Sequence, residues 1–267
     1  MTGAALSTDS RSTYDAASGH FDQPALGFWD RYGQRTVARL GLRPGVRVLD
    51  VCCGTGASAL HAARAVGPGG SVLGVDISAR LLDLAREKAS REGVENIEFR
   101  IGDMERLELA DGGFDAVVIV FGIFFAEDMA ARLRALRRLL RPGGVLAVTT
   151  WAPGFFEPLY TPFLEAARAR LPGVKEYRPW DRLAHPDDVA SLLRRAGIER
   201  FDVTAEEGRE PLRGPEDWWT IVLGTGLRWF VDQMGPAAAP AFREECLARA
   251  RGVSEIATNV VYAVARD

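Results

Sequence analysis

The chain has 267 residues, of which 47% are hydrophobic and 26% charged, and its formal net charge at pH 7 is −3. These values are ordinary for folded globular proteins and exclude a disordered chain, a collagen or a disulfide-bonded scaffold. The length accommodates one core domain of about 150 residues and an accessory layer. A small negative net charge creates no field that gathers polyanions, so we expect a small-molecule substrate and no nucleic-acid partner.

No targeting or membrane-spanning signal is apparent. The longest apolar run, Val117 to Phe125, is far shorter than the ~20 residues of a membrane-spanning helix. The first residues lack the basic start and apolar core of a secretory signal, so we expect a cytoplasmic protein. The cysteines Cys52, Cys53 and Cys246 are too few for a disulfide framework or a four-ligand zinc site, and no metal is expected.

In chain order, the first predicted unit is a lid. Residues 1–13 are small and polar, which predicts a disordered start. Residues 14–42 interleave aromatic and charged side chains, a pattern typical of amphipathic helices that lie on another surface. We therefore assign residues 1–42 to a disordered start and an N-terminal helical lid.

Residues 43–151 alternate between β-rich runs and helical patterns. Strands are predicted over 46–51, 71–75, 97–101, 114–121 and 145–151. Between them lie a helix over 57–66, one that Ser78 caps and Gly93 ends, and one that begins near Met129 and is broken at Pro142–Gly144. Such alternation predicts βαβ units and a parallel sheet, here the cofactor-binding core.

Residues 152–186 are rich in proline and aromatic side chains and are assigned to a lid insertion, with a helix over 161–171. Residues 187–267 complete the core, with a helix over 187–196 and strands over 201–204 and 257–265. A helical cap insertion at about 208–251, with helices over 216–234 and 239–250, separates these two strands. A strand that follows such a long excursion can pair antiparallel.

The strand over 46–51 runs into the turn Cys52–Gly56 at a helix start. Glycines let the backbone approach a ligand closely, and the unpaired N–H groups of a helix N-terminus favour an anion. Asp76 ends the next strand, where a carboxylate can accept both hydroxyls of a ribose. Together these features predict a nucleoside-containing cofactor.

Residues 54–59 also satisfy the dinucleotide-binding fingerprint, so a nicotinamide cofactor is an alternative. Asp50, at the tip of the first strand, could meet an ammonium group but would repel a pyrophosphate. Asp103, after the third strand, could accept a hydrogen bond from an adenine amino group. No Tyr-x-x-x-Lys pair exists to serve a short-chain dehydrogenase. The combination favours a ligand with an amino acid at one end and adenosine at the other.

The ordered series VLDVCCGTG, GVDIS, GDMERL, FDAVVIVFGI and LLRPGGVLAVTTW resembles the motif set of class I S-adenosylmethionine-dependent methyltransferases, nearest the ubiquinone/menaquinone-biosynthesis group. The resemblance covers roughly residues 46–151. It implies an α/β fold, a Rossmann-like doubly wound seven-stranded sheet of order 3-2-1-4-5-7-6 with strand 7 antiparallel, plus helical lid and cap segments. It also implies S-adenosylmethionine as cofactor and S-adenosylhomocysteine as product.

The resemblance also assigns roles at the cofactor. It places Asp50 and the glycine turn at the methionine end, Asp76 at the ribose, Asp103 at the adenine and Phe121 near the sulfur. The family usually has glycine where Cys52 stands, so we expect this turn to adopt a geometry that a side chain tolerates. The cofactor-binding residues implied are Asp50, Cys52, Gly54, Thr55, Gly56, Asp76, Ile77, Asp103, Met104, Phe121 and Gly122.

Aromatic side chains concentrated in the lid and at strand ends suggest a pocket for an apolar or aromatic acceptor. The predicted pocket residues are Tyr14, Phe21, Trp29, Phe124, Phe125 and Trp151. Methyl transfer from a sulfonium needs an in-line approach and releases a neutral thioether, so catalysis can rest on positioning and water exclusion. A hydroxyl or carbon-acid acceptor would also need a base, for which His20 is the candidate.

The sequence therefore predicts a methyltransferase that acts on a small, largely apolar or aromatic acceptor. Methylation of an oxygen, a nitrogen or a carbon is equally compatible with these residues. The alternatives are a nucleotide-dependent oxidoreductase and a donor-binding protein without methyl-transfer activity.

Overall fold

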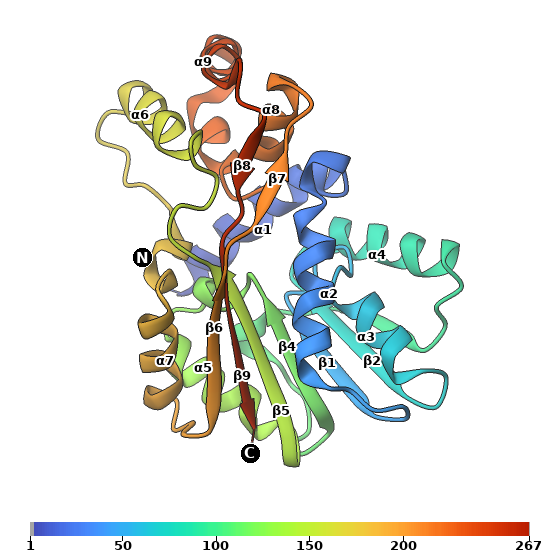
Figure 1. The fold of residues 1–267 in the computed structure, drawn as a ribbon. Helices are drawn as coiled ribbons and strands as arrows, with labels where there is room; N and C mark the ends of the chain where they lie inside the picture. The colour runs from blue at the N-terminus through green and yellow to red at the C-terminus, as the bar shows by residue number, and fades with distance from the viewer. Residues whose placement is uncertain (1–2, 267) are drawn as a thin grey trace.

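The computed structural model describes residues 3–266, and its centre is a seven-stranded sheet of order β3-β2-β1-β4-β5-β9-β6 (Figure 1). Strands β1 to β5 are parallel, and β9 pairs antiparallel with both β5 and β6. Since β9 is the seventh strand of this sheet in chain order, the predicted order and the antiparallel seventh strand are confirmed. The strands are β1 (Arg47–Val51), β2 (Ser71–Asp76), β3 (Ile97–Ile101), β4 (Phe114–Val120), β5 (Leu140–Trp151), β6 (Phe201–Glu206) and β9 (Val260–Arg266).

Helices cover both faces of the sheet. On one face lie α2 (Phe28–Leu40), α3 (Ala59–Val66) and α4 (Ala79–Arg91), and on the other α5 (Met129–Arg138) and α7 (Pro186–Arg195) (Figure 1). The central strands are buried on both faces, which explains their continuous apolar runs. As predicted, Ser78 caps α4, because its hydroxyl accepts a hydrogen bond from the backbone N–H of Leu81.

The N-terminal segment is helical where the sequence predicted disorder. Helix α1 (Gly3–Phe21) is followed by the short helix η1 (Pro24–Leu26). Although the side chains of α1 are small and polar, Ser10, Thr13 and Ala17 are buried. Asp15 accepts a hydrogen bond from the Ser78 hydroxyl at 2.5 Å. Tertiary contacts therefore stabilise a segment whose composition alone favours disorder; residues 1 and 2 lie outside the described part.

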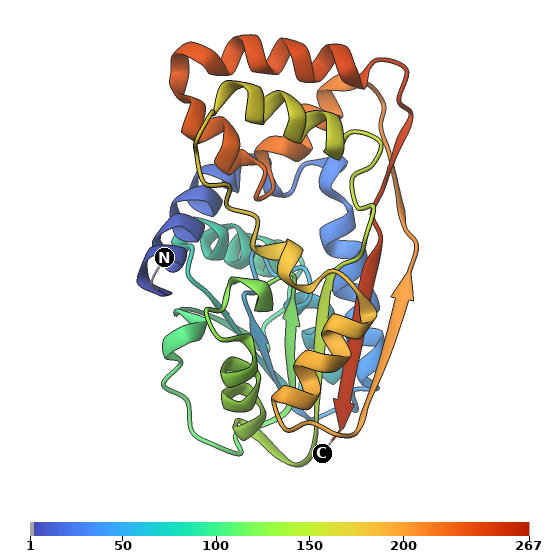
Figure 2. The same ribbon diagram turned by 90° about the vertical axis from the view of Figure 1, so that its left-hand side faces the viewer.

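A helical cap lies over the carboxyl ends of the parallel strands, with α9 along its top (Figure 2). A two-stranded ribbon, β7 (Arg209–Pro211) and β8 (Glu255–Ala257), joins α8 and α9 to strands β6 and β9. Within residues 3–266, no helix combines the length and apolarity needed to cross a membrane. The remaining elements are α6 (Tyr160–Arg170), α8 (Pro215–Leu223), α9 (Arg228–Ala250), η2 (Met104–Arg106), η3 (Ile123–Phe125) and η4 (Pro179–Leu183).

Two local predictions in the second half of the chain were wrong, and a third was right. Strand β5 begins at Leu140 and includes Pro142–Gly144, with a register shift against β4 where the sequence predicted a break. The helix predicted over 216–234 is interrupted after Leu223, because Gly224 and Gly226 pack closely on neighbouring side chains. The break expected between the helices over 216–234 and 239–250 is confirmed, because Gly235 within α9 has a non-helical backbone, with φ +70° and ψ 176°.

Candidate active site

A cavity lies at the carboxyl ends of β1, β2 and β4, where the strand order reverses direction in the sheet. This is the usual ligand site of doubly wound sheets. Its volume is about 980 Å³ including the open mouth, which is ample for a nucleoside-sized ligand. The lining residues are Ser10, Tyr14, Phe21, Trp29, Cys52, Cys53, Gly54, Ala57, Ser58, Asp76, Ile77, Leu81, Gly102, Asp103, Met104, Glu105, Val120, Phe121 and Phe125. We call it the donor cavity.

Asp76 is the buried carboxylate of the donor cavity. One oxygen accepts the backbone N–H of Gly54 at 2.9 Å, and the other accepts the N–H of Ser78 at 2.9 Å. Burial raises the pKa of Asp76, while these amide hydrogen bonds oppose the shift. Because a carboxylate oxygen can accept two hydrogen bonds, each oxygen retains capacity for a ligand hydroxyl. The geometry fits the predicted ribose contact.

The glycine turn forms a cradle against the lid. Gly54 has φ +54°, and a Cβ there would lie 3.4 Å from the ring of Phe21 on α1. Thr55 does not line the cavity; its hydroxyl donates to Asp22 at 2.7 Å, and Lys88 donates to the same carboxylate oxygen at 2.8 Å. Thr55 therefore ties the turn to the segment that follows α1.

Asp50 lies behind the wall of the donor cavity. It is fully buried, and one oxygen accepts the hydroxyl of Ser58, a residue that does line the cavity, at 2.6 Å. The other oxygen, Oδ1, has no hydrogen-bond partner among the described residues. Burial raises the pKa of Asp50 to about 7. An ammonium group held nearby would favour the ionised carboxylate, which is the charge complementarity that a methionine moiety needs.

Replacement of Asp50 by asparagine tests this burial through the pH dependence of stability. Because the folded-state pKa lies above the unfolded value near 4, the contribution of Asp50 to the stability of the wild-type protein falls as the pH rises from about 4 to 7, and no further above that. Asp50→Asn has no carboxyl group to titrate at this position. Its free energy of unfolding should therefore rise by roughly 2–4 kcal/mol relative to wild type across that interval. Denaturant unfolding at several pH values measures it. A difference that is constant or shrinks as the pH rises would contradict the expectation.

The opposite end of the donor cavity holds Asp103, Met104 and Ile77. Asp103 accepts the backbone N–H of Glu105 at 2.9 Å and so caps η2. Gly102 is required in this turn, since a Cβ there would lie 2.7 Å from Val75. The arrangement is compatible with the predicted adenine contacts.

The turn at Cys52 keeps a glycine-like conformation, so the expected side-chain-tolerant geometry is wrong. Cys52 has φ +59°, a region that side chains rarely occupy and that stores strain. Its sulfur lies 3.7 Å from that of Met104. A Cβ on Gly122 would lie 2.7 Å from the Cβ of Cys52, so Gly122 makes room for this side chain and does not itself line the cavity. Neighbouring Phe121 is also strained, with φ +53°.

A second, much smaller cavity adjoins the first, and we call it the aromatic cavity; the empty space between its walls is about 290 Å³ when its opening to solvent is included. Tyr14, Trp29 and Phe121 line both cavities and so form their common wall. The Phe121 and Trp151 rings stack with centroids 4.2 Å apart. The aromatic cavity is lined by Tyr14, Trp29, Phe121, Phe124, Trp151, Phe155, Phe156, Trp180, Thr225, Gly226 and Leu227.

The six aromatic residues predicted for an acceptor pocket divide between these cavities. Phe124 and Trp151 line only the aromatic cavity, whereas Phe21 and Phe125 line only the donor cavity. Tyr14 and Trp29 line both. The sequence analysis did not predict three further aromatic lining residues or the loop between α8 and α9. The two adjacent phenylalanines of the lid insertion could have indicated part of this cavity. The missed residues are Phe155, Phe156, Trp180, Thr225, Gly226 and Leu227.

Tyr14 and His20 differ in their relation to the cavities. Burial, reinforced by Tyr177 and Asp76, holds the pKa of Tyr14 well above its usual range, so its hydroxyl stays protonated and can donate. His20 is half-buried and lines neither cavity. Burial and the nearby Arg228 lower the pKa of His20. The base role suggested for His20 stays a prediction without support from its position.

The sequence and the fold both match known methyltransferases. The model of the ubiE/COQ5 methyltransferase family matches residues 12–174, more than half of the chain. A demethylmenaquinone methyltransferase of Lactococcus lactis subsp. lactis is 34% identical over 63% of this chain and 72% of its own length. A demethylmenaquinone methyltransferase of Staphylococcus aureus (strain JH9) is 38% identical over 42% of this chain, which spans less than half (46%) of that relative.

Among solved structures, a phosphoethanolamine N-methyltransferase of Haemonchus contortus, in complex with phosphomonomethylethanolamine and S-adenosylhomocysteine, superposes with a TM-score of 0.58. The match covers 96% of this chain and 59% of that one at 19% identity, and it supports the fold. The sheet order and the family match together settle the class. The chain belongs to the ubiE/COQ5 methyltransferase family and is an S-adenosylmethionine-dependent methyltransferase.

Proposed function

We propose that this enzyme transfers a methyl group to a small, flat, largely apolar ring bound in the aromatic cavity. The observation that carries the proposal is the common wall of Tyr14, Trp29 and Phe121 between the two cavities. A donor in one cavity and a ring in the other would lie next to each other at these shared residues, and an in-line displacement requires that no side chain stands between the reacting atoms.

Residues of the donor cavity would hold S-adenosylmethionine, which supplies a methyl group activated on a sulfonium centre. Asp76 would accept the ribose hydroxyls, and Asp103 would accept from the adenine amino group. Asp50 would favour the ammonium group electrostatically, through the wall formed by Ser58. The glycine turn, with Gly54 free of a side chain, would allow close approach of the methionine moiety.

The acceptor we favour is a quinone-type ring in its reduced form. The relatives named above are demethylmenaquinone methyltransferases, and the walls of the aromatic cavity are mostly aromatic side chains, which suit an apolar ring. Only the electron-rich reduced ring has a carbon nucleophilic enough to accept a methyl group. That carbon would form the new bond while the carbon–sulfur bond breaks, and the ring proton would leave to solvent.

The remaining contribution of the chain would be positioning and exclusion of water. The segments 1–42, 152–186 and about 208–251 would act as the cover of the two cavities. Tyr14, from the first of these segments, would donate a hydrogen bond from its neutral hydroxyl to an oxygen of the ring. In a closed apolar site such a bond is stronger than in water.

Calorimetric titration with S-adenosylhomocysteine, NAD and NADP tests the cofactor. We expect binding of the first alone; binding of a nicotinamide nucleotide would support an oxidoreductase. Incubation with S-adenosylmethionine and 1,4-naphthoquinol should then yield a product heavier by about 14 daltons, the mass of one added CH₂. If the cofactor binds but no ring acceptor in a quinol and phenol panel gains this mass, the acceptor class is wrong, and a donor-binding protein without methyl-transfer activity becomes the better description.

A further inference from the structure

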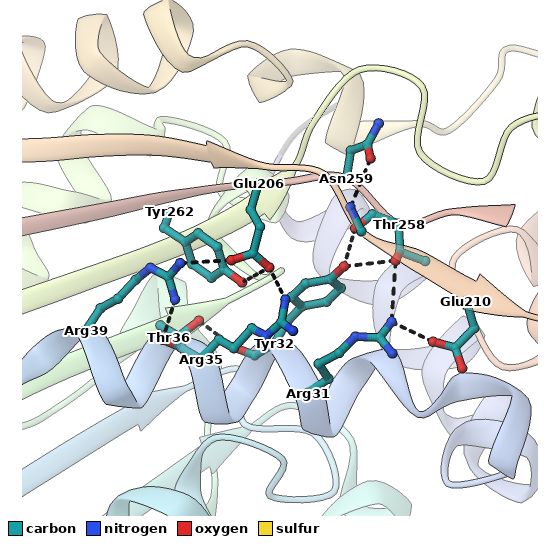
Figure 3. Close-up of polar contacts among 11 residues, drawn as sticks. Arg31, Tyr32, Arg35, Thr36, Arg39, Glu206, Glu210, Thr258, Asn259 and Tyr262 are labelled. Atoms are coloured by element: carbon teal, nitrogen blue, oxygen red, sulfur yellow. Dashed lines mark hydrogen bonds and ion pairs between the residues drawn. The ribbon is translucent and has the colours of Figure 1, made fainter.

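A row of polar contacts joins helix α2 to residues 206–211 and 255–259, which link the cap to strands β6 and β9 and which we call the connector (Figure 3). Arg31 pairs with Glu210 at 2.6 Å, Arg39 pairs with Glu206 at 2.9 Å, and Arg35 also pairs with Glu206. Exposed ion pairs contribute little individually, but Glu210 is only 6% exposed. We call this row, together with Tyr32 and Thr258, the clasp.

Tyr32 is the buried centre of the clasp. Its hydroxyl donates to the backbone carbonyl of Thr258 at 2.5 Å and lies 2.9 Å from the Thr258 hydroxyl (Figure 3). Gly208 faces this hydroxyl so closely that a Cβ there would lie 1.8 Å from it. The same Cβ would lie 2.8 Å from the carbonyl and hydroxyl oxygens of Thr258, so Gly208 leaves room for the Tyr32–Thr258 contact.

The ring of Tyr32 reaches the common wall of the two cavities. Its centroid lies 6.0 Å from that of Phe121, edge-on at 79°, and 6.4 Å from that of Trp151. One turn before it on α2, Trp29 is itself part of the wall. Tyr32 therefore contacts the cavity wall with its ring and the cap connector with its hydroxyl.

The connector leads directly to the far side of the aromatic cavity. The backbone N–H of Thr258 donates to the carbonyl of Gly208 at 2.7 Å. This hydrogen bond joins the two segments of the connector next to ribbon β7–β8. From β7 the chain runs through α8 to Thr225–Leu227, which line the aromatic cavity together with Phe121. A shift of the connector against α2 would change the separation of these two walls.

We infer that Tyr32 is a positioning residue for the acceptor: its hydroxyl sets the cap connector, and through it the Thr225–Leu227 wall, at a fixed distance from Phe121. The donor cavity has no wall from this loop. The identity of the ring in this inference rests on the proposed function. The link from the Tyr32 hydroxyl through the connector to Thr225–Leu227 does not. Acceptor binding should therefore depend on this hydroxyl, whereas donor binding should not.

Tyr32→Phe tests the link, because it removes the hydroxyl and keeps the ring. With 1,4-naphthoquinol as probe we expect KM for the ring to rise roughly tenfold, the scale of one lost buried hydrogen bond, with kcat and the S-adenosylhomocysteine Kd within about twofold of wild type. Hydrogen exchange of residues 209–227 should accelerate in the same variant. Tyr262→Phe is the matched control, since its hydroxyl contacts Glu206 at 3.3 Å without touching Thr258; it should show neither change.

Gly208→Ala approaches the same contact from the connector. In a wild-type background the new Cβ would collide with the Tyr32 hydroxyl. Gly208→Ala should therefore raise KM and the hydrogen-exchange rate of residues 209–227 at least as much as Tyr32→Phe does. The double variant should be less impaired than the sum of the two single-variant effects. Unchanged exchange at 209–227 in Tyr32→Phe, an equal effect of Tyr262→Phe, or a parallel loss of S-adenosylhomocysteine affinity would overturn the inference. Failure of wild-type enzyme to methylate the naphthoquinol would instead count against the proposed acceptor, because the exchange measurement would still decide the role of Tyr32.

Discussion

Asp76→Asn should weaken S-adenosylhomocysteine binding by about 10- to 150-fold, the range expected for the loss of a hydrogen bond to a charged group. The carboxylate accepts backbone N–H groups from both Gly54 and Ser78, so an asparagine must turn its NH₂ group toward one of these donors. One amide would lose its partner, and the acceptor oriented toward the ribose would be lost. Calorimetric titration of the variant measures the change in Kd.

Asp83→Asn on α4 is the control, because Asp83 is exposed and pairs only with Arg86 one turn away. It makes the same chemical change outside the cavity and should bind S-adenosylhomocysteine as wild type does. A Kd within threefold of wild type for Asp76→Asn would mean that Asp76 contributes to the turn but not to the ligand.

Gly33→Ala should destabilise the protein by roughly 1–3 kcal/mol and weaken S-adenosylhomocysteine binding, the second large effect we expect. Gly33 lies within α2, where alanine is normally favoured over glycine by about 1 kcal/mol. Here a Cβ would lie 2.7 Å from the backbone of Ala57 and 2.8 Å from the nitrogen of Ser58. Because both residues line the donor cavity, the substitution would push the cavity wall itself. Denaturant unfolding and calorimetry measure the two effects.

Gly19→Ala provides the matched comparison in another helix. Gly19 lies within α1, and a Cβ there would meet nothing within 4 Å. This variant should gain about 0.5–1 kcal/mol in the free energy of unfolding, because it removes backbone freedom from the unfolded chain. If both substitutions stabilised the protein, the close packing of α2 on the turn would be refuted.

The sequence predicted the central strands closely because each is buried on both faces. The apolar runs of β1, β2 and β4 were located to within one residue, and the resemblance supplied the sheet order. Ribbon β7–β8 escaped notice because each of its strands has only three residues and is largely exposed. Helix α1 escaped notice because the burial of Ser10 and Thr13 depends on partners that composition does not reveal.

The donor cavity was more predictable than the aromatic cavity for a topological reason. Asp76, Asp103 and Met104 follow parallel strands, whose carboxyl ends meet at one edge of the sheet. The aromatic cavity is instead assembled from segments distant in the chain, such as Trp29, Trp180 and the loop at Thr225, and no periodicity relates them. Asp50 is buried and is not among the lining residues of the donor cavity, so its contact with the cofactor stays a prediction.

The position of β9 also has a consequence for how this chain is made. Strand β9 lies between β5 and β6, but it follows both of them in the chain, after the whole of α8 and α9. Until residues 260–266 are synthesised, β5 and β6 each present an unpaired edge, the kind of surface that recruits strands from other molecules. Strand β9 can pair with β5 and β6 only after the cap has been synthesised, so this pairing joins residues that are distant in the chain. Substitutions that slow the cap's folding should therefore lower the yield of active enzyme even where they leave the finished structure unchanged.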